Sequence, residues 1–294
     1  MPYGKFLRHL QYEKRYSTHT LTAYGNDLKQ FFYFIESTYQ VKEVRDITHF
    51  FIRSWIVSLM EQKIDSRSVN RKISTLKSLY KFLLREKAVE HNPILKITSP
   101  KVSKKLPVFV EQKDMNKLLD GVDFKEGFPG LRDKLVINLF YKTGMRLSEL
   151  INLTDKDVDI HSLTVKVLGK RNKERVIPFA TSLVTILEKY LTIRNREIEM
   201  KEHGNLFVTA NGEICYPMMI YRTVRKYLDE FTSLEKRSPH VLRHTYATHL
   251  LNKGADLNAV KDLMGHASLA ATQVYTHNSI ETLKKAFDQA HPKA

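Results

Sequence analysis

The segment at residues 96–109, KITSPKVSKKLPVF, most constrains the fold, because its pattern continues neither a helix nor a strand. It contains two prolines and four lysines, and its apolar residues follow no regular period. We interpret it as an extended basic linker. A chain of 294 residues can form two compact domains, each with its own core. We therefore predict one domain at residues 1–103 and a second at residues 104–294.

The first domain is predicted to be a bundle of helices. Residues 17–35 carry apolar side chains at positions 21, 24, 28, 31, 32 and 35, which is a helical period, and Ser17 is a suitable N-cap. Further helices are predicted at residues 48–62 and 66–87. The predicted buried stripe of the 66–87 helix consists of Ile73, Leu76, Tyr80 and Leu83.

The net charge predicts a polyanionic partner. Lysine and arginine number 48 against 32 aspartates and glutamates, a formal net charge of +16. The first 106 residues carry 20 basic and 9 acidic side chains, so this region is expected to make the main electrostatic contact with that partner. Four cations of the 66–87 helix lie off its buried stripe and are candidate DNA contacts, although a solvated helix face is the alternative. They are Arg67, Arg71, Lys77 and Lys81.

The cysteine content and the length of the apolar segments indicate the cellular compartment of the protein. Cys215 is the single cysteine, which excludes an internal disulfide and a thiolate cluster for structural zinc. The chain shows no signal-peptide pattern, and no segment approaches the roughly 18 to 20 apolar residues of a membrane span. We expect a soluble cytoplasmic protein without a membrane contact.

The second domain is predicted to be mainly helical with one small antiparallel sheet. The runs LTVKVLG and ERVIPF alternate apolar and polar residues around KRNK, which indicates a β-hairpin. The predicted helices of this domain are at residues 111–120, 129–142, 181–200, 217–231, 239–253 and 256–264.

The stretch PHVLRHTYATHL contains a histidine pair whose spacing suggests a metal site. His240 and His244 are four residues apart, as zinc ligands on one helix face would be, but no thiolate or intervening carboxylate completes a ligand set. A spacing of three places His240 and Arg243 on one face instead. We predict no metal site here, and we expect His244 and His249 to serve in packing, in capping or at the surface.

Four short segments contain candidate functional residues, and each is a weak indication of function by itself: TGMRLSEL, LGKRNKER, PHVLRHTYATHLL and MGHASLAATQVYTH. The order Arg, Lys, His-x-x-Arg, Gly-His and Tyr, with these intervening lengths, resembles the tyrosine recombinase (phage integrase) family. The sequence is most similar to the bacterial Xer recombinases. STHTLTAYGNDL and RKISTLKSLYKF resemble the SAM-like core-binding domain of that family, and LKKAFDQAHPKA resembles the Xer C-terminal tail.

The resemblance implies a set of catalytic residues and a reaction without a cofactor, a metal ion or ATP. Two arginine guanidinium groups would stabilise the negative charge that develops on the phosphate, and a tyrosine would form a 3′-phosphotyrosine link. A histidine would accept the tyrosine proton, a lysine would protonate the departing 5′ hydroxyl, and a second histidine would bond to the phosphate. The implied residues are Arg146, Lys170, His240, Arg243, His266 and the nucleophile Tyr275. Glu149 either orients Arg146 or begins a helix.

The resemblance also implies partners and a biological role. Four protomers, identical or mixed, would act on double-stranded DNA that carries two short palindrome-like sites. The amphipathic helix predicted from residue 279 would join the protomers to one another. A paralogous recombinase and a septal DNA translocase are candidate partners. Chromosome dimer resolution at a dif-like site is the implied role. The alternatives are an invertase or integrase of a mobile or phase-variable element, a type IB topoisomerase, and a DNA-binding protein without catalysis.

Overall fold

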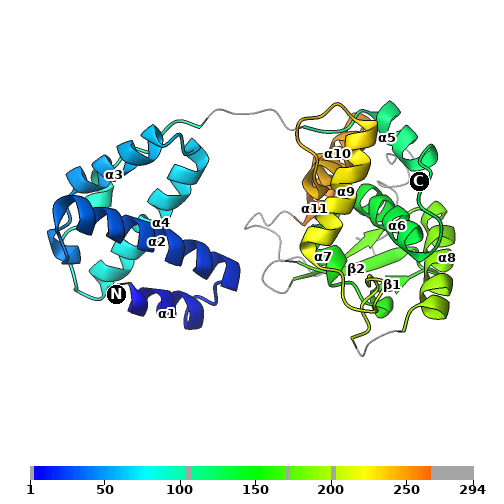
Figure 1. The fold of residues 1–294 in the computed structure, drawn as a ribbon, viewed down its shortest axis with the longest axis horizontal. Coiled ribbons are helices and arrows are strands. Elements are labelled where there is room, and N and C mark those ends of the chain that lie inside the picture. The colour runs from blue at the N-terminus through cyan, green and yellow to red at the C-terminus, as the bar shows by residue number, and fades with distance from the viewer. Residues whose placement is uncertain (1–2, 103–107, 170–172, 200–202, 266–294) are drawn as a thin grey trace. The chain divides into compact units, whose positions relative to one another are not determined.

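The computed structural model describes residues 3–102, 108–169, 173–199 and 203–265 (Figure 1). The chain divides into two compact units, residues 1–105 and residues 106–294. Both units are dominated by helices, and the fold class predicted from the sequence is confirmed. No helix in the described part of the chain is long and apolar enough to cross a membrane.

The first unit is a bundle of helices, two of which the sequence pattern delimits closely. Ser17 accepts a hydrogen bond from the Thr20 amide at 3.3 Å and caps α2, as predicted. All members of the stripe predicted for α4 are buried, because its apolar residues recur with the helical period. The helices of this unit are α1 (Gly4–Tyr12), α2 (Thr18–Tyr39), α3 (His49–Glu61) and α4 (Ser66–Arg85), with 3₁₀ turns at Val44–Asp46 and Pro93–Lys96.

The second unit surrounds one central helix, α6, whose residues are buried on nearly every side. Helices α8 and α10 pack directly against α6. The helices are α5 (Gln112–Asp120), α6 (Phe128–Thr143), α7 (Leu147–Ile151), α8 (Ser182–Glu197), α9 (Pro217–Phe231), α10 (Pro239–Asn252) and α11 (Leu257–Met264), with a 3₁₀ turn at Asp155–Asp157. The six helices predicted between residues 111 and 264 are present, and α7 is an addition too short to show a period. The helix predicted from residue 279 lies outside the described residues.

The small sheet of the second unit is antiparallel, in the order β1–β2–β3. Its strands are β1 (Val158–Asp159), β2 (Thr164–Leu168) and β3 (Glu174–Pro178). Strands β2 and β3 form the predicted hairpin, in which Val165 lies opposite Ile177 and Val167 lies opposite Arg175. The alternation of the strands turns Val165, Val167 and Ile177 into the core, and it turns Arg175 to the same side.

Candidate active site

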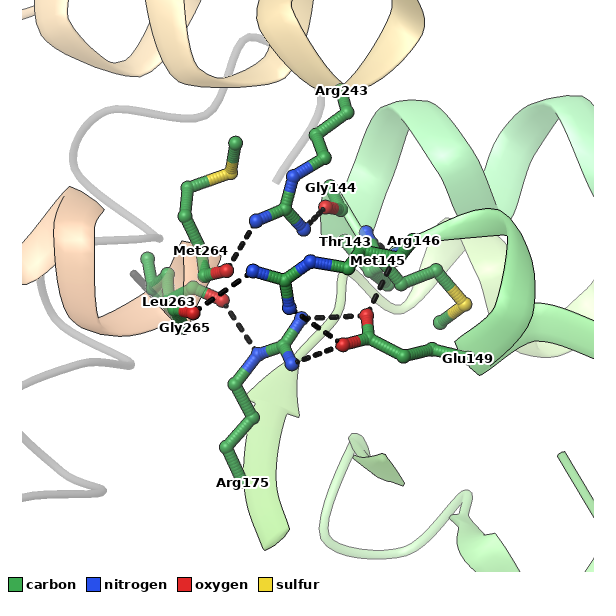
Figure 2. A network of polar contacts seen from close by, with 10 residues as sticks. All are labelled: Thr143, Gly144, Met145, Arg146, Glu149, Arg175, Arg243, Leu263, Met264 and Gly265. Atoms are coloured by element: carbon green, nitrogen blue, oxygen red, sulfur yellow. Dashed lines mark hydrogen bonds and ion pairs between the residues drawn. The ribbon is translucent and has the colours of Figure 1, made fainter. Parts of the chain in front are cut away.

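Three guanidinium groups meet in the second unit, each supplied by a different element. Arg146 is the N-cap residue of α7, Arg175 lies in β3 and Arg243 lies in α10. Figure 2 shows the three side chains reaching one another, with the end of α11 on one side of them and Glu149 on the other. The structure thus brings together the two arginines singled out in the sequence and a third that the sequence analysis missed.

The turn between α6 and α7 depends on Gly144. This residue ends α6 with φ +60°, a conformation that favours glycine, and its carbonyl accepts a hydrogen bond from Nη1 of Arg243. A Cβ at this position would lie 2.3 Å from a ring carbon of Tyr246. The glycine in TGMR therefore lets α10 approach closely enough for Arg243 to reach the turn that carries Arg146.

The three guanidinium groups also bind the carboxyl end of α11, where each donates to one of three consecutive backbone carbonyls. The pairs are Arg175 with Leu263, Arg243 with Met264, and Arg146 with Gly265. The bonds from Arg175 and Arg146 are both 2.9 Å long. Cations at a helix C-terminus are favourable because the unpaired carbonyls there carry partial negative charge. These bonds fasten α11 to β3, α7 and α10.

Glu149 is the carboxylate at the centre of the cluster. It accepts from the backbone amide of Arg146 at 2.6 Å and from the Arg146 guanidinium at 2.8 Å. It also accepts from both terminal nitrogens of Arg175, at 2.7 and 2.9 Å. The sequence left two interpretations of Glu149 open, a role at a helix start and a role in orienting Arg146. The structure supports both, because Glu149 caps the first turn of α7 through a capping box and also bonds to the Arg146 guanidinium.

The ionisation of Glu149 follows from these contacts. Burial raises the pKa of its carboxyl, but the hydrogen bonds and charge of Arg175, together with the bonds from Arg146, outweigh burial and lower the pKa to about 2. Only 4% of the residue is exposed. Glu149 is therefore ionised throughout the neutral range.

Counted over the described residues, the cluster has an excess of positive charge, because it combines three guanidinium groups with one carboxylate. Burial, and then repulsion by Arg146 and Arg175, lowers the pKa of Arg243 to about 10, while Glu149 opposes this shift. Arg243 remains protonated at neutral pH. Arg146 and Arg243 each use two of their five N–H donors in bonds to other described residues. The arrangement suits a tetrahedral anion such as a phosphodiester, which guanidinium forks bind in a bidentate manner.

The histidines of α10 occupy different surroundings. His240 is exposed and lies one helical turn before Arg243. His244 lies at the surface, but part of its ring is shielded from water. This shielding, and then the charges of His240 and Arg243, lower the pKa of the imidazole. His249 is buried, and its Nδ1 lies 3.1 Å from the Tyr141 hydroxyl, so it is a packing residue. Within the described part of the chain, no group of three histidine, cysteine, aspartate or glutamate side chains could hold a metal ion.

Lys170, His266 and Tyr275 lie outside the described residues, as does the predicted tail helix from residue 279. The residues that directly precede two of them lie at the cluster. A Cβ on Gly169 would be 3.6 Å from Nη1 of Arg175 and 3.7 Å from Oε1 of Glu149. A Cβ on Gly265 would be 3.1 Å from Nη1 of Arg175. Gly169 therefore lies beside the Arg175–Glu149 pair, and Gly265 lies beside Arg175.

The four α4 cations proposed as DNA contacts are all exposed in the first unit. Arg71 pairs with the buried carboxylate of Asp27, while 46% of its side chain stays exposed. Lys77 and Lys81 border a shallow depression that Leu84 and Leu95 also line. Their exposure is compatible with a contact to DNA and with a solvated face.

Comparison with protein families decides the classification. Residues 109–282 match the model of the phage integrase family, and residues 4–87 match the N-terminal SAM-like domain of phage integrases. The chain belongs to the phage integrase family. Members of this family transfer DNA strands without a metal ion or ATP, and this protein is a Xer-type tyrosine recombinase of site-specific recombination.

Related proteins agree with this classification, and a solved structure shares the fold. The tyrosine recombinase XerC of Anoxybacillus flavithermus is 37% identical, over 98% of this chain and 97% of that protein. The XerC of Chlorobaculum tepidum is 35% identical, over 99% of this chain and 94% of that protein. The crystal structure of the XerH recombinase bound to palindromic difH DNA shares the fold, with a TM-score of 0.74 and 22% identity, over 96% of this chain and 82% of that one.

Proposed function

We propose that Arg146 and Arg243 bind the scissile phosphate and that Tyr275 is the nucleophile. The convergence of the two guanidinium groups beside an ionised Glu149 supports this assignment, since it provides a fixed positive site for a phosphodiester. Attack on phosphorus adds negative charge to the non-bridging oxygens, and donors held in place before the reaction stabilise that charge most effectively. A bound metal ion is not required for this task when two planar cations already supply it.

The remaining residues have roles in proton transfer. Only about a thousandth of free tyrosine is ionised at neutral pH, so the Tyr275 proton passes to His240 as its oxygen attacks phosphorus. The bond from phosphorus to the 5′ oxygen breaks, and Lys170 protonates that oxygen. His266 donates a hydrogen bond to the phosphate. One phosphate ester replaces another, so the 5′ hydroxyl of a second duplex reverses the step without an external energy source.

We further propose that the biological reaction is chromosome dimer resolution at a dif-like site in the cytoplasm. The relatives named XerC, which match nearly the whole chain at 35 to 38% identity, support this role over that of a mobile-element invertase or integrase. A tetramer on two paired sites would perform the exchange, with a paralogous recombinase and a septal DNA translocase as candidate partners.

Trapping covalent protein–DNA adducts in the source organism and sequencing the attached DNA tests this role. One chromosomal locus with a short imperfect palindrome is the expected result. Adducts at the ends of a mobile or invertible element would support the alternative role instead. Adducts spread over unrelated sequences, together with relaxation of plasmid lacking a cognate site, would point to a topoisomerase.

The proposed tetramer depends on the C-terminal tail. Deletion of the residues after position 279 should leave binding of a single site intact and abolish cooperative pairing of two sites. Gel-shift assays with one-site and two-site DNA measure both properties. Intact recombination by the truncated protein would refute this role of the tail.

A further inference from the structure

Arg175 is a buried cation at a core-facing position of a strand. It lies opposite Val167 in the β2–β3 ladder and is only 6% exposed. A buried charge is costly unless it is paired and hydrogen-bonded, and Arg175 has both kinds of partner. A hydrophobic residue would fill the same position without this requirement, so the charge at this position needs an explanation.

The guanidinium group of Arg175 joins two parts of the site through three hydrogen bonds. Its two terminal nitrogens bind the two oxygens of Glu149, and its Nε donates to the Leu263 carbonyl at the end of α11. The backbone of Gly265 packs against the same group, because a Cβ there would lie 3.1 to 3.2 Å from three of the Arg175 side-chain atoms.

The first of these connections controls the orientation of Arg146. A bidentate pair fixes the plane of the Glu149 carboxylate. The same carboxylate accepts from the backbone and from the side chain of Arg146, one bond on each oxygen. If Arg175 released the carboxylate, Glu149 could rotate, and the Arg146 guanidinium would lose one of the two groups that fix its position.

Arg175 also lies beside the last described residues before two members of the proposed catalytic set. Gly169 and Gly265 both border Arg175, and they directly precede Lys170 and His266. The Arg175 side chain therefore lies beside both glycines and is linked to Arg146 through Glu149.

We propose that Arg175 is a positioning residue for DNA strand cleavage: it holds Glu149, and through it Arg146, together with the carboxyl end of α11. The inference rests on the proposed roles of Arg146 and Tyr275. Arg175 acts through these neighbours and does not itself bind the scissile phosphate.

The principal test compares two conservative substitutions of buried arginines in the full-length protein. Arg175→Lys keeps the charge but loses the two-pronged fork. Arg194→Lys is the matched control, because Arg194 is 2% exposed and makes a bidentate pair with Asp155, at 2.8 and 2.6 Å, without a bond to any described residue of the site. DNA affinity, the melting temperature and the single-turnover rate of covalent complex formation are measured for both variants.

Arg175→Lys should slow cleavage by about tenfold to a hundredfold, as expected when a reacting group is misplaced by about 1 Å. DNA affinity should stay within about twofold, because the phosphate contacts outside the site remain. Arg194→Lys should lower the melting temperature without slowing cleavage. Cleavage by Arg175→Lys within about twofold of the wild-type rate, or an equal loss in the Arg194→Lys control, would overturn the inference.

A double-mutant cycle with Glu149→Gln tests the route of the effect. If Arg175 acts through Glu149, the double variant should cleave DNA about as fast as the slower of the two single variants. Fully multiplicative losses would show two independent actions and contradict this route.

Hydrogen exchange of the peptide covering residues 257–265 measures the positioning contact without any reaction. Exchange should accelerate in Arg175→Lys and remain at the wild-type rate in Arg194→Lys; equal exchange in the two variants would overturn the inference. A wild-type protein that binds its site but never forms a covalent complex would instead refute the proposed function, so the two failures are distinguishable.

Discussion

Nη2 of Arg146 lies 2.9 Å from the carbonyl oxygen of Gly265, although the two residues are 119 positions apart in the sequence. The bond links the start of α7 to the end of α11. It also means that the arginine proposed to bind phosphate is held by groups on two sides, Glu149 and the α11 terminus. A group fixed in this way needs little reorganisation when charge develops on the phosphate.

Substituting Arg146 by lysine should separate binding from cleavage. Lysine keeps the positive charge but cannot bond to Glu149 and to a phosphate through one planar fork. We expect covalent complex formation to slow by about 10² to 10³, which is the usual cost of losing one donor to a developing oxyanion. Affinity for DNA, measured by gel shift, should change by less than about threefold. An unchanged cleavage rate would contradict the role of Arg146.

Protonation of Glu149 should weaken the fold in acid. The folded-state pKa of about 2 lies below the ordinary value of 4.5, so the carboxylate contributes stability that is fully present above pH 4.5. This stability is lost as the pH falls from 4.5 towards 2, and it amounts to about 3 kcal/mol.

Glu149→Gln provides the comparison, because glutamine does not titrate. Urea unfolding followed by circular dichroism should show the variant well below the wild type at pH 6, and the difference should shrink at pH 3. A difference independent of pH would show that the carboxylate charge is not what stabilises this pair.

Gly144→Ala should disrupt the turn between α6 and α7. Its Cβ would enter the Tyr246 ring in a backbone conformation that L-residues adopt only at a cost. We expect destabilisation of about 2 kcal/mol or more, measured as a lower melting temperature, together with slower cleavage because the Gly144 carbonyl also holds Arg243. Gly4→Ala is the control, since a Cβ there meets no atom within 4 Å. Equal melting temperatures for the two variants would contradict this account.

The exposed cations of α4 should contribute to the salt dependence of DNA binding. If Lys77 neutralises one phosphate, Lys77→Ala should reduce the slope of log affinity against log salt by about 1, whereas Lys77→Arg should preserve it. Titrations of duplex DNA by fluorescence anisotropy at several salt concentrations measure the slope. Identical slopes for the alanine variant and the wild type would leave Lys77 as part of a solvated face.

Local patterns in the sequence predicted much of the fold. The Ser17 cap, the α4 stripe and the β2–β3 hairpin depend on residues close together in the chain, and each is present. The strand β1 was missed because its two residues are too few to show an alternation. The α1 helix also went unpredicted, although its Phe6 and Leu10 are buried four residues apart.

The candidate site was only partly predictable, for a physical reason. Arg146 and Arg243 were found through motif order, but Arg175 was missed because a lone arginine in a strand usually faces solvent. The alternation of β3 could have indicated it, because Arg175 lies two residues from Ile177 and so faces the core on the same side. A charged side chain at a core-facing position needs a buried partner. The binding of three arginines to the α11 carbonyls leaves no sequence signature, because the acceptors are backbone atoms.

Formation of a covalent protein–DNA complex tests the central claim most directly. The wild-type protein and the Tyr275→Phe variant are incubated, with EDTA present and without ATP, with a nicked suicide substrate carrying the cognate site. We predict that the wild type forms an adduct joined through a 3′ phosphate, and that Tyr275→Phe binds the same DNA with equal affinity but forms none. An adduct that persists in Tyr275→Phe, or a wild-type protein that binds the cognate site without forming any adduct, would contradict the account.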